Sequence, residues 1–149
     1  YKPVGVTCTE KDPHAKRKIS DVFRYPVRVT YAGRLDKDSE GLLIMTNDGD
    51  FSNKLTHPSS LVNKTYRVTV EGDADEEQLF KMQQGIVIDG RKTEPCDVFI
   101  AEKRGERTVL IFIIHEGRNR QIRKMCEEVG LEVARLKRTA IGSIKLGML

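Results

Sequence analysis

The sequence has few cysteines and no long apolar run. Its 149 residues include three widely spaced cysteines, Cys8, Cys96 and Cys126. Because no C-x-x-C pair occurs, a zinc site and a disulfide framework are both disfavoured, and free thiols in a reducing cytoplasm are the simplest interpretation. No apolar run reaches the roughly 18 residues needed to cross a bilayer, and no signal peptide is visible. The sequence therefore predicts a cytoplasmic protein without a membrane span.

No repeat, low-complexity segment or linker divides the chain, whose length suits one domain with a real core. Because it opens on Tyr1 rather than Met, we expect it to be part of a longer protein. Charged residues make up 32%, and the net charge is +4. An excess of positive charge this small does not identify a nucleic-acid partner. Clustering of the positive residues would be needed to indicate one. With no exposed apolar stripe apparent, we expect a monomer.

Three segments are expected to be helices: residues 49–57, 73–85 and 119–130. The second has acidic residues in its first turn and Gly85 as a stop. In the third, apolar residues recur at i, i+3, i+4 and i+7, which predicts one buried stripe. The residues of that stripe are Ile122, Met125, Cys126 and Val129.

Strand patterns outnumber helical ones. Residues 64–72 alternate, with Tyr66 expected to share one face with the valines at positions 68 and 70. Residues 41–46 are expected to form a strand buried on both faces, residues 86–117 two or three strands, and residues 132–146 the last strand material. Regular strand–helix alternation, which a parallel nucleotide-binding sheet requires, is missing. The sequence therefore predicts an α+β fold with a largely antiparallel mixed sheet flanked by helices and loops.

An acidic loop, "DKDSEG" at residues 36–41, follows directly after Leu35. Its spacing imitates a calcium-binding EF-hand, but the required Glu at the twelfth position is Asn47 and no flanking helices are predicted. A solvated turn is the plainest alternative. A catalytic carboxylate is the third, because an apolar neighbour and an adjacent guanidinium can fix Asp36 while Asp38 and Glu40 stay in water.

Five motifs then point to a known family. "YKPVGV", "GRLDKDSEGLLIMTNDGDF", "LTHPSSLVNKTYRVTVEG", "EGRNRQIRKM" and "VARLKRTAIGSIKLG" occur in this order and span essentially the whole chain. Together they resemble the bacterial ribosomal RNA pseudouridine synthases of the RsuA type. The resemblance implies a pseudouridine synthase fold and a catalytic domain over residues 1–149. Many members begin with an additional RNA-binding domain of the ribosomal-protein S4 type, and in this sequence nothing precedes Tyr1.

The resemblance implies that a uridine in ribosomal RNA is converted to pseudouridine without a cofactor or metal, with Asp36 as the essential catalytic group. It also implies that Tyr66 stacks on the target base; a core tyrosine is the alternative. Helix geometry places Arg123 on the shoulder of the apolar stripe, with Arg120 and Lys124 pointing toward water. Because a half-buried arginine needs a carboxylate, we expect an Arg123–Asp36 ion pair, as in the family, rather than an arginine with its head in solvent.

Positive charge clusters near the carboxyl end: residues 118–138 contain seven Lys or Arg and three Glu. This excess suits an RNA-phosphate groove. The residues expected to contact RNA, partly from the resemblance, are Arg34, Arg118, Asn119, Arg120, Gln121, Lys124, Leu136, Lys137 and Arg138. A non-catalytic RNA-binding module is the main alternative, and a metal-dependent nuclease or phosphatase is the second. The motifs favour large-subunit ribosomal RNA slightly as the partner.

Overall fold

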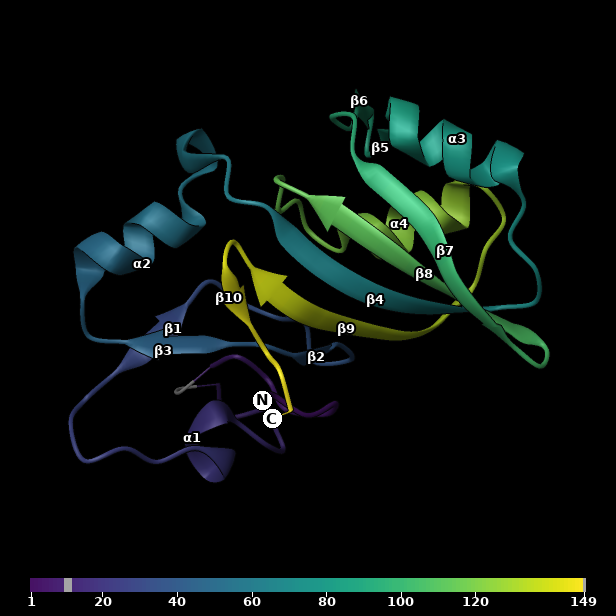
Figure 1. Ribbon diagram of the computed structural model, residues 1–149. Helices are drawn as coiled ribbons and strands as arrows, with labels where there is room; N and C mark the ends of the chain where they lie inside the picture. The colour runs from purple at the N-terminus through teal and green to yellow at the C-terminus, as the bar shows by residue number, and fades with distance from the viewer. Residues whose placement is uncertain (10–11, 149) are drawn as a thin grey trace.

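A computed structural model describes residues 1–9 and 12–148. Its main feature is one six-stranded sheet (Figure 1). Five of its strands are antiparallel neighbours, in the order β10 (Ile144–Lys145), β9 (Val133–Ile141), β4 (Lys64–Glu71), β8 (Arg107–Ile114) and β7 (Asp97–Arg104). The sixth, β2 (Glu40–Gly41), pairs with β9 in parallel. The predicted α+β fold with a largely antiparallel mixed sheet is therefore confirmed.

The remaining elements lie on either side of this sheet. Figure 1 shows α3 and α4 together at one end, and the β1–β3 ribbon with α2 and α1 at the other. Their bounds are α1 Ile19–Val22, β1 Thr30–Ala32, β3 Ile44–Thr46, α2 Gly49–Thr56, η1 Pro58–Ser60, α3 Glu76–Gln84, β5 Val87–Ile88, β6 Arg91–Lys92 and α4 Gln121–Glu128. All three predicted helices are present, within a few residues of the expected ends. No helix in the described ranges is both long and apolar enough to cross a bilayer.

The main core lies between the sheet and helices α3 and α4. Val68 and Val70 of β4 are fully buried, and they belong to one apolar cluster with Met82 of α3 and Met125 of α4. The predicted alternation of β4 and the predicted stripe of α4 are confirmed, because the stripe residues all belong to this cluster or pack against it. Tyr66 packs at its edge. The apolar half of β4 is thus covered by helices.

The cysteines are free thiols, as expected: Cys8 and Cys126 are buried and Cys96 is partly buried. Burial raises the pKa of the Cys96 thiol to about 11 and that of Cys126 to about 12. Cys96 and Cys126 therefore stay protonated near neutral pH, and the buried cysteines contribute to packing.

Two strand predictions were wrong in detail. Residues 41–46 do not form one strand buried on both faces; the run divides between β2, which joins β9, and β3, which pairs with β1 and is only half-buried. It divides because the chain leaves one sheet for another after Leu42, whose N–H donates to the Arg138 carbonyl. Residues 86–117 contain four strands rather than two or three, because Asp89 and Gly90 form a tight turn with positive φ that makes the extra β5–β6 hairpin.

Candidate active site

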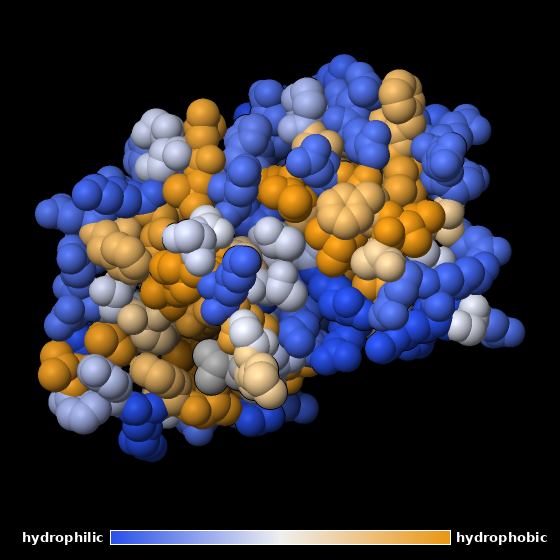
Figure 2. Space-filling view, viewed as in Figure 1, coloured by the Kyte–Doolittle hydropathy of each residue, from blue (hydrophilic) through white to orange (hydrophobic). Residues whose placement is uncertain are grey.

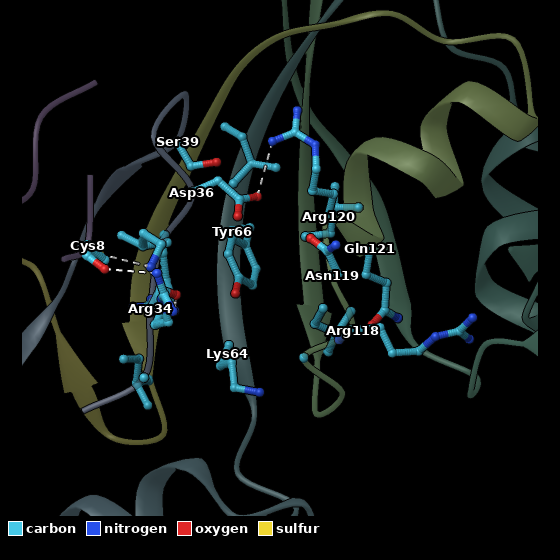
Figure 3. A pocket seen from close by; sticks show the side chains of 18 of the residues that line it. Cys8, Arg34, Asp36, Ser39, Lys64, Tyr66, Arg118, Asn119, Arg120 and Gln121 are labelled. Carbon is cyan, nitrogen blue, oxygen red and sulfur yellow. Dashed lines mark hydrogen bonds and ion pairs between the residues drawn. The ribbon is translucent and has the colours of Figure 1, made fainter. Parts of the chain in front are cut away.

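A pocket of about 650 Å³ lies over the part of the sheet that α3 and α4 do not cover. Because side chains alternate along a strand, Lys64 and Tyr66 lie on the same face of β4 as the buried valines, and they line the pocket instead of the core. Figure 3 shows Tyr66 between two walls. One wall carries Arg34 and Asp36, and the other is formed by residues 118–121.

Asp36 lies in a tight turn at the pocket. Leu35, directly before it, is 6% exposed and anchors the loop in an apolar cluster. The turn closes with a hydrogen bond of 3.1 Å from the Ser39 N–H to the Asp36 carbonyl oxygen. The Asp36 side chain is 40% exposed, and in Figure 3 it lies beside one end of the Tyr66 side chain, opposite the hydroxyl. A buried leucine thus fixes a carboxylate that stays accessible.

The predicted Arg123–Asp36 ion pair was wrong. The arginine that reaches Asp36 is Arg120, whose Nη1 lies 3.5 Å from Asp36 Oδ2. Arg123 is half-buried, as expected, but its Nη2 donates to the Asp38 carbonyl oxygen at 2.9 Å and to Ser39 Oγ at 3.2 Å. Arg123 therefore supports the turn behind Asp36. Arg120 turns inward because it precedes α4 with a left-handed backbone (φ 53°), so the helical phase does not apply to it.

The other two acids of the loop are held by different arginines. Arg120 donates two hydrogen bonds to the Asp38 carboxylate, at 3.0 and 2.8 Å, and these lower the pKa of Asp38. Glu40 is 5% exposed and accepts two hydrogen bonds from Arg135, at 2.9 and 2.6 Å. These bonds lower the pKa of Glu40. The expectation that Glu40 stays in water was therefore wrong: the three carboxylates diverge, and two of them fix the loop.

Two buried cations hold the same loop from behind. Lys2 is 2% exposed, and its Nζ donates to the carbonyl oxygens of Pro3 at 2.9 Å, Val6 at 2.7 Å and Lys37 at 3.5 Å. Burial lowers the pKa of Lys2. No role was predicted for this lysine, although it lies in the motif "YKPVGV".

Arg138 is 4% exposed and is not on the surface where an RNA contact was expected. Its Nε donates to the Leu42 carbonyl oxygen at 2.9 Å, and its Nη1 donates to the Arg34 carbonyl oxygen at 3.4 Å. These two carbonyls flank the turn that carries Asp36. Arg138 therefore connects β9 to the loop, and because it also lines the pocket its contact with RNA stays a prediction.

The opposite wall is also shaped by buried polar groups. Lys64 Nζ donates to the carbonyl oxygens of His115 and Glu116, at 3.3 and 3.1 Å, and burial lowers its pKa. Gln121 is buried; its amide donates to the Glu116 carboxylate and accepts from the Arg118 N–H. Gln121 therefore shapes the wall, and its expected contact with RNA stays a prediction. Lys64 was missed, and its spacing of two residues from Tyr66 was the available signal.

The structure brings ten of the twelve predicted site residues to the pocket: Arg34, Asp36, Tyr66, Arg118, Asn119, Arg120, Gln121, Arg123, Leu136 and Arg138. The other two do not line it. Lys124 pairs with Asp89 at 2.6 Å, and Lys137 Nζ lies 5.5 Å from the centre of the Tyr1 ring. Lys124 and Lys137 therefore lie outside the pocket lining, and their contacts with RNA stay predictions.

The pocket is strongly basic. Asp36 is its single acidic lining residue within the described chain, against seven basic ones: Arg34, Lys37, Lys64, Arg118, Arg120, Arg123 and Arg138. Such a lining attracts a polyanion. Within it, the Asp36 carboxylate can act as a nucleophile or a base, and the ring of Tyr66 offers a flat face to an aromatic base.

Comparison with known proteins agrees with this geometry. Residues 1–128 match the family described as RNA pseudouridylate synthase. The chain belongs to this family. The match covers the loop of Asp36, the strand of Tyr66 and all of α4, so the resemblance of the sequence motifs is confirmed.

Named relatives extend the comparison. The chain is 40% identical to ribosomal large subunit pseudouridine synthase B of Bacillus subtilis strain 168, over 98% of this chain and 61% of that protein. It is also 40% identical to ribosomal large subunit pseudouridine synthase E of Xanthomonas campestris pv. campestris, over 99% of this chain and 88% of that protein. It thus spans less than two thirds of the Bacillus protein.

A solved structure supports the fold directly. A crystal structure of a pseudouridylate synthase superposes with a TM-score of 0.86 at 32% identity, over 97% of this chain and 62% of that one. The predicted pseudouridine synthase fold is therefore confirmed.

Proposed function

We propose that this chain is the catalytic part of an enzyme that converts a uridine in bacterial ribosomal RNA to pseudouridine. The observation that carries the proposal is the Asp36 carboxylate beside the Tyr66 ring in a basic pocket. Family membership supports the reaction, and the names of two relatives favour large-subunit RNA as the substrate. Because ribosomal RNA is the proposed substrate, we also propose a cytoplasmic location.

The proposed reaction is an isomerisation. The N1–C1′ bond breaks, the uracil rotates while bound, and C5 bonds to C1′; C5 loses a proton and N1 gains one. Because no atom or electron is gained overall, the proposal needs no cofactor. Asp36 acts as a nucleophile at C1′, as a nucleophile at the base, or as a base toward a sugar proton; a carboxylate suits each of these routes. Tyr66 holds the base by stacking.

The target uridine must leave its stack to reach Asp36. Extrusion costs a few kcal/mol, which stacking on Tyr66 and phosphate contacts with the basic lining offset. Asn119 and Arg34 line the two walls of the pocket, and we expect them to contact the extruded nucleotide or its neighbours. Arg118 lines the same wall as Asn119, but its guanidinium donates to the carbonyl oxygens of Ile88 and Arg91 and extends away from Tyr66 in Figure 3. The affinity for RNA should therefore fall steeply as salt is raised; a flat response would remove the basic lining as the binding surface.

Pseudouridine formation tests the proposal. Unmodified large-subunit ribosomal RNA is incubated in EDTA with the wild-type chain, with Asp36→Asn, and with Asp50→Asn as an exposed control on α2. Wild type and control should form product, and Asp36→Asn should lose at least about 1,000-fold in rate. Its melting temperature should stay near that of wild type, because Asp36 is partly exposed and forms one long ion pair.

Three results would contradict the proposal. Turnover by Asp36→Asn would remove Asp36 from the chemistry. The wild type could bind RNA but form no pseudouridine, even when the assembled large-subunit precursor is the substrate. This result would favour a non-catalytic RNA-binding module. Activity that requires a divalent ion would favour the nuclease or phosphatase alternative.

A further inference from the structure

An exposed aromatic segment lies outside the pocket, between α1 and β1. In this segment, residues 22–29, Phe23 is 39% exposed, Tyr25 62% and Val27 54%. Figure 2 shows orange and blue side chains intermingled at the lower left, over this part of the chain. The expectation of a chain without an exposed apolar stripe was therefore wrong. A patch of this kind on a small protein marks an interaction surface.

The two aromatic rings of the segment form a platform. The rings of Phe23 and Tyr25 are stacked, with centroids 6.3 Å apart and planes within 6° of parallel. Phe23 has an extended backbone, so side chains two residues apart project to the same side. The rings border a shallow groove whose other wall includes Val29 and Met45 of the β1–β3 region. The platform is thus a flat, supported aromatic surface.

The charge around the platform favours an anionic partner. Residues 16–28 contain five basic residues, Lys16, Arg17, Lys18, Arg24 and Arg28, and one acid, Asp21. Asp21 Oδ2 accepts from the Lys18 N–H at 2.8 Å. Arg24 and Arg28 are exposed, and neither forms an ion pair with any residue in the described ranges. Charged residues are usually rare at the centre of a protein-docking patch. Arginines between exposed aromatic rings instead suit a single-stranded RNA partner.

The segment is continuous with the pocket. It leads through β1 directly to Gly33 and Arg34, which line one pocket wall. From Tyr25 to Arg34 the chain can extend at most about 30 Å at the rise of a β-strand. An RNA strand that leaves the pocket past Arg34 therefore meets the platform within a few nucleotides.

We propose that residues 22–29 are a second RNA-contacting surface, on which bases of single-stranded RNA flanking the target stack on Phe23 and Tyr25 while Arg24 and Arg28 contact phosphates. The inference rests on the proposed function, because it takes the RNA substrate from there. It assigns this surface a role in affinity and in the choice of substrate, and none in the chemistry at Asp36.

A tryptophan reporter tests base stacking directly. The chain has no tryptophan, so Tyr25→Trp introduces one emitter on the platform. A short oligouridine RNA should quench this emission, and inorganic polyphosphate should not, because it carries charge without bases. The matched control is Phe80→Trp, at a 58% exposed aromatic position on α3. Its emission should not respond to either probe.

Affinity measurements add a second readout. Tyr25→Ala should bind the oligouridine about 10-fold more weakly than wild type, and Phe80→Ala should bind like wild type. Arg24→Gln should reduce the slope of log affinity against log salt by about one. Tyr25→Trp should bind at least as well as wild type, because its ring stacks more strongly.

Three outcomes would overturn the inference. The first two are equal oligouridine affinity of Tyr25→Ala and Phe80→Ala, and no quenching of Tyr25→Trp. A wild-type dimer that Tyr25→Ala converts to a monomer, with RNA affinity unchanged, would likewise overturn it in favour of self-association. These outcomes are independent of catalysis. A chain that binds through Tyr25 but forms no pseudouridine contradicts the proposed function alone, and an active chain without dependence on Tyr25 contradicts this inference alone.

Discussion

The two halves of strand β4 have the same neighbours in the sheet but opposite surroundings. Val68 and Val70 lie beneath α3 and α4 in the main core. Lys64 and Tyr66, on the same face of the same strand, line an open basic pocket. The covered half is held by apolar packing, whereas the pocket half is held by buried and half-buried ions that bond to backbone carbonyls or to one another. A fold can thus carry a rigid site without covering it, provided that each buried charge has oxygen partners.

The difference also separates stability from function. Removing an apolar side chain from the covered half leaves a cavity, which affects the whole domain. Removing an ion from the pocket half should release the loop of Asp36 and leave the core in place. Lys2, Arg138 and the Glu40–Arg135 pair all act on this one loop. The four experiments below test whether the two halves are as separable as their contacts indicate.

The largest expected effect is on stability, from Met82→Ala in the covered half. Met82 is fully buried in the core cluster, so its truncation should lower the free energy of unfolding by about 3 kcal/mol. The rate of pseudouridine formation per folded molecule should not change well below the melting temperature. Urea unfolding and single-turnover assays measure the two quantities. Phe80→Ala, on the exposed side of α3, should change stability by no more than about 0.5 kcal/mol. A slower rate per folded molecule in Met82→Ala would show that the halves are coupled.

Arg138→Met should instead affect the rate more than the stability. The loss of the two hydrogen bonds that flank the Asp36 turn should lower the maximal rate by about 100-fold, as small misplacements of catalytic groups do. The stability should fall less, because Nη2 of this buried arginine has no partner in the described part of the chain, and the variant removes that unsatisfied group. Arg138→Lys should not restore the rate, since an ammonium cannot reach both carbonyls. Arg104→Met, at an exposed ion pair, is the control. A variant with weaker RNA binding but a normal maximal rate would return Arg138 to the RNA-contacting role.

A pH series sharpens the comparison further. Arg135 lowers the pKa of Glu40 below the value it has in the unfolded chain. The pair therefore stabilises the fold fully at pH values above the unfolded pKa, and this contribution is lost as the pH falls through the folded pKa. Glu40→Gln should therefore lose less stability than wild type between pH 7 and acid pH. Urea midpoints measured along the series test this, with the exposed Glu128→Gln of α4 as control. Parallel acid curves for wild type and Glu40→Gln would exclude the pair as a source of acid sensitivity.

The smallest expected effect distinguishes the two arginines of the site. A double-mutant cycle between Asp36→Asn and Arg120→Met should give a coupling energy of about 0.5 kcal/mol, the size typical of an exposed pair. The same cycle with Arg123→Met should give no measurable coupling, because Arg123 contacts Asp38 and Ser39 instead. A stronger coupling to Arg123 would restore the pair that the sequence favoured.

Local patterns in the sequence predicted the local parts of this structure. The alternation of β4 and the stripe of α4 are confirmed, since each depends on side chains a few residues apart. The motif containing Asp36 predicted where the pocket lies. The helical phase failed only for Arg120, which lies just outside α4 with a left-handed backbone. The periodicity of apolar residues does not show at which residue a helix begins.

Contacts between distant segments could not be predicted from the sequence. Glu40 and Arg138 looked like surface residues, and both are buried because β2 pairs with β9, almost a hundred residues later in the chain. The same pairing divided the apolar run at residues 41–46. Lys2 and Lys64 were missed for a related reason: their partners are backbone carbonyls, which every residue has and no sequence pattern marks.

The pairing of β2 with β9 also bears on when the site can form during synthesis. The loop of Asp36 is completed by Arg135 and Arg138, which are made about a hundred residues after it, and by Lys2, whose backbone exchanges two hydrogen bonds with Gly41. Contacts this distant in sequence form late in folding. A ribosome that has made Asp36 and Tyr66 has therefore not yet made a complete site, because the nascent chain can complete the loop of Asp36 only after β9 has emerged.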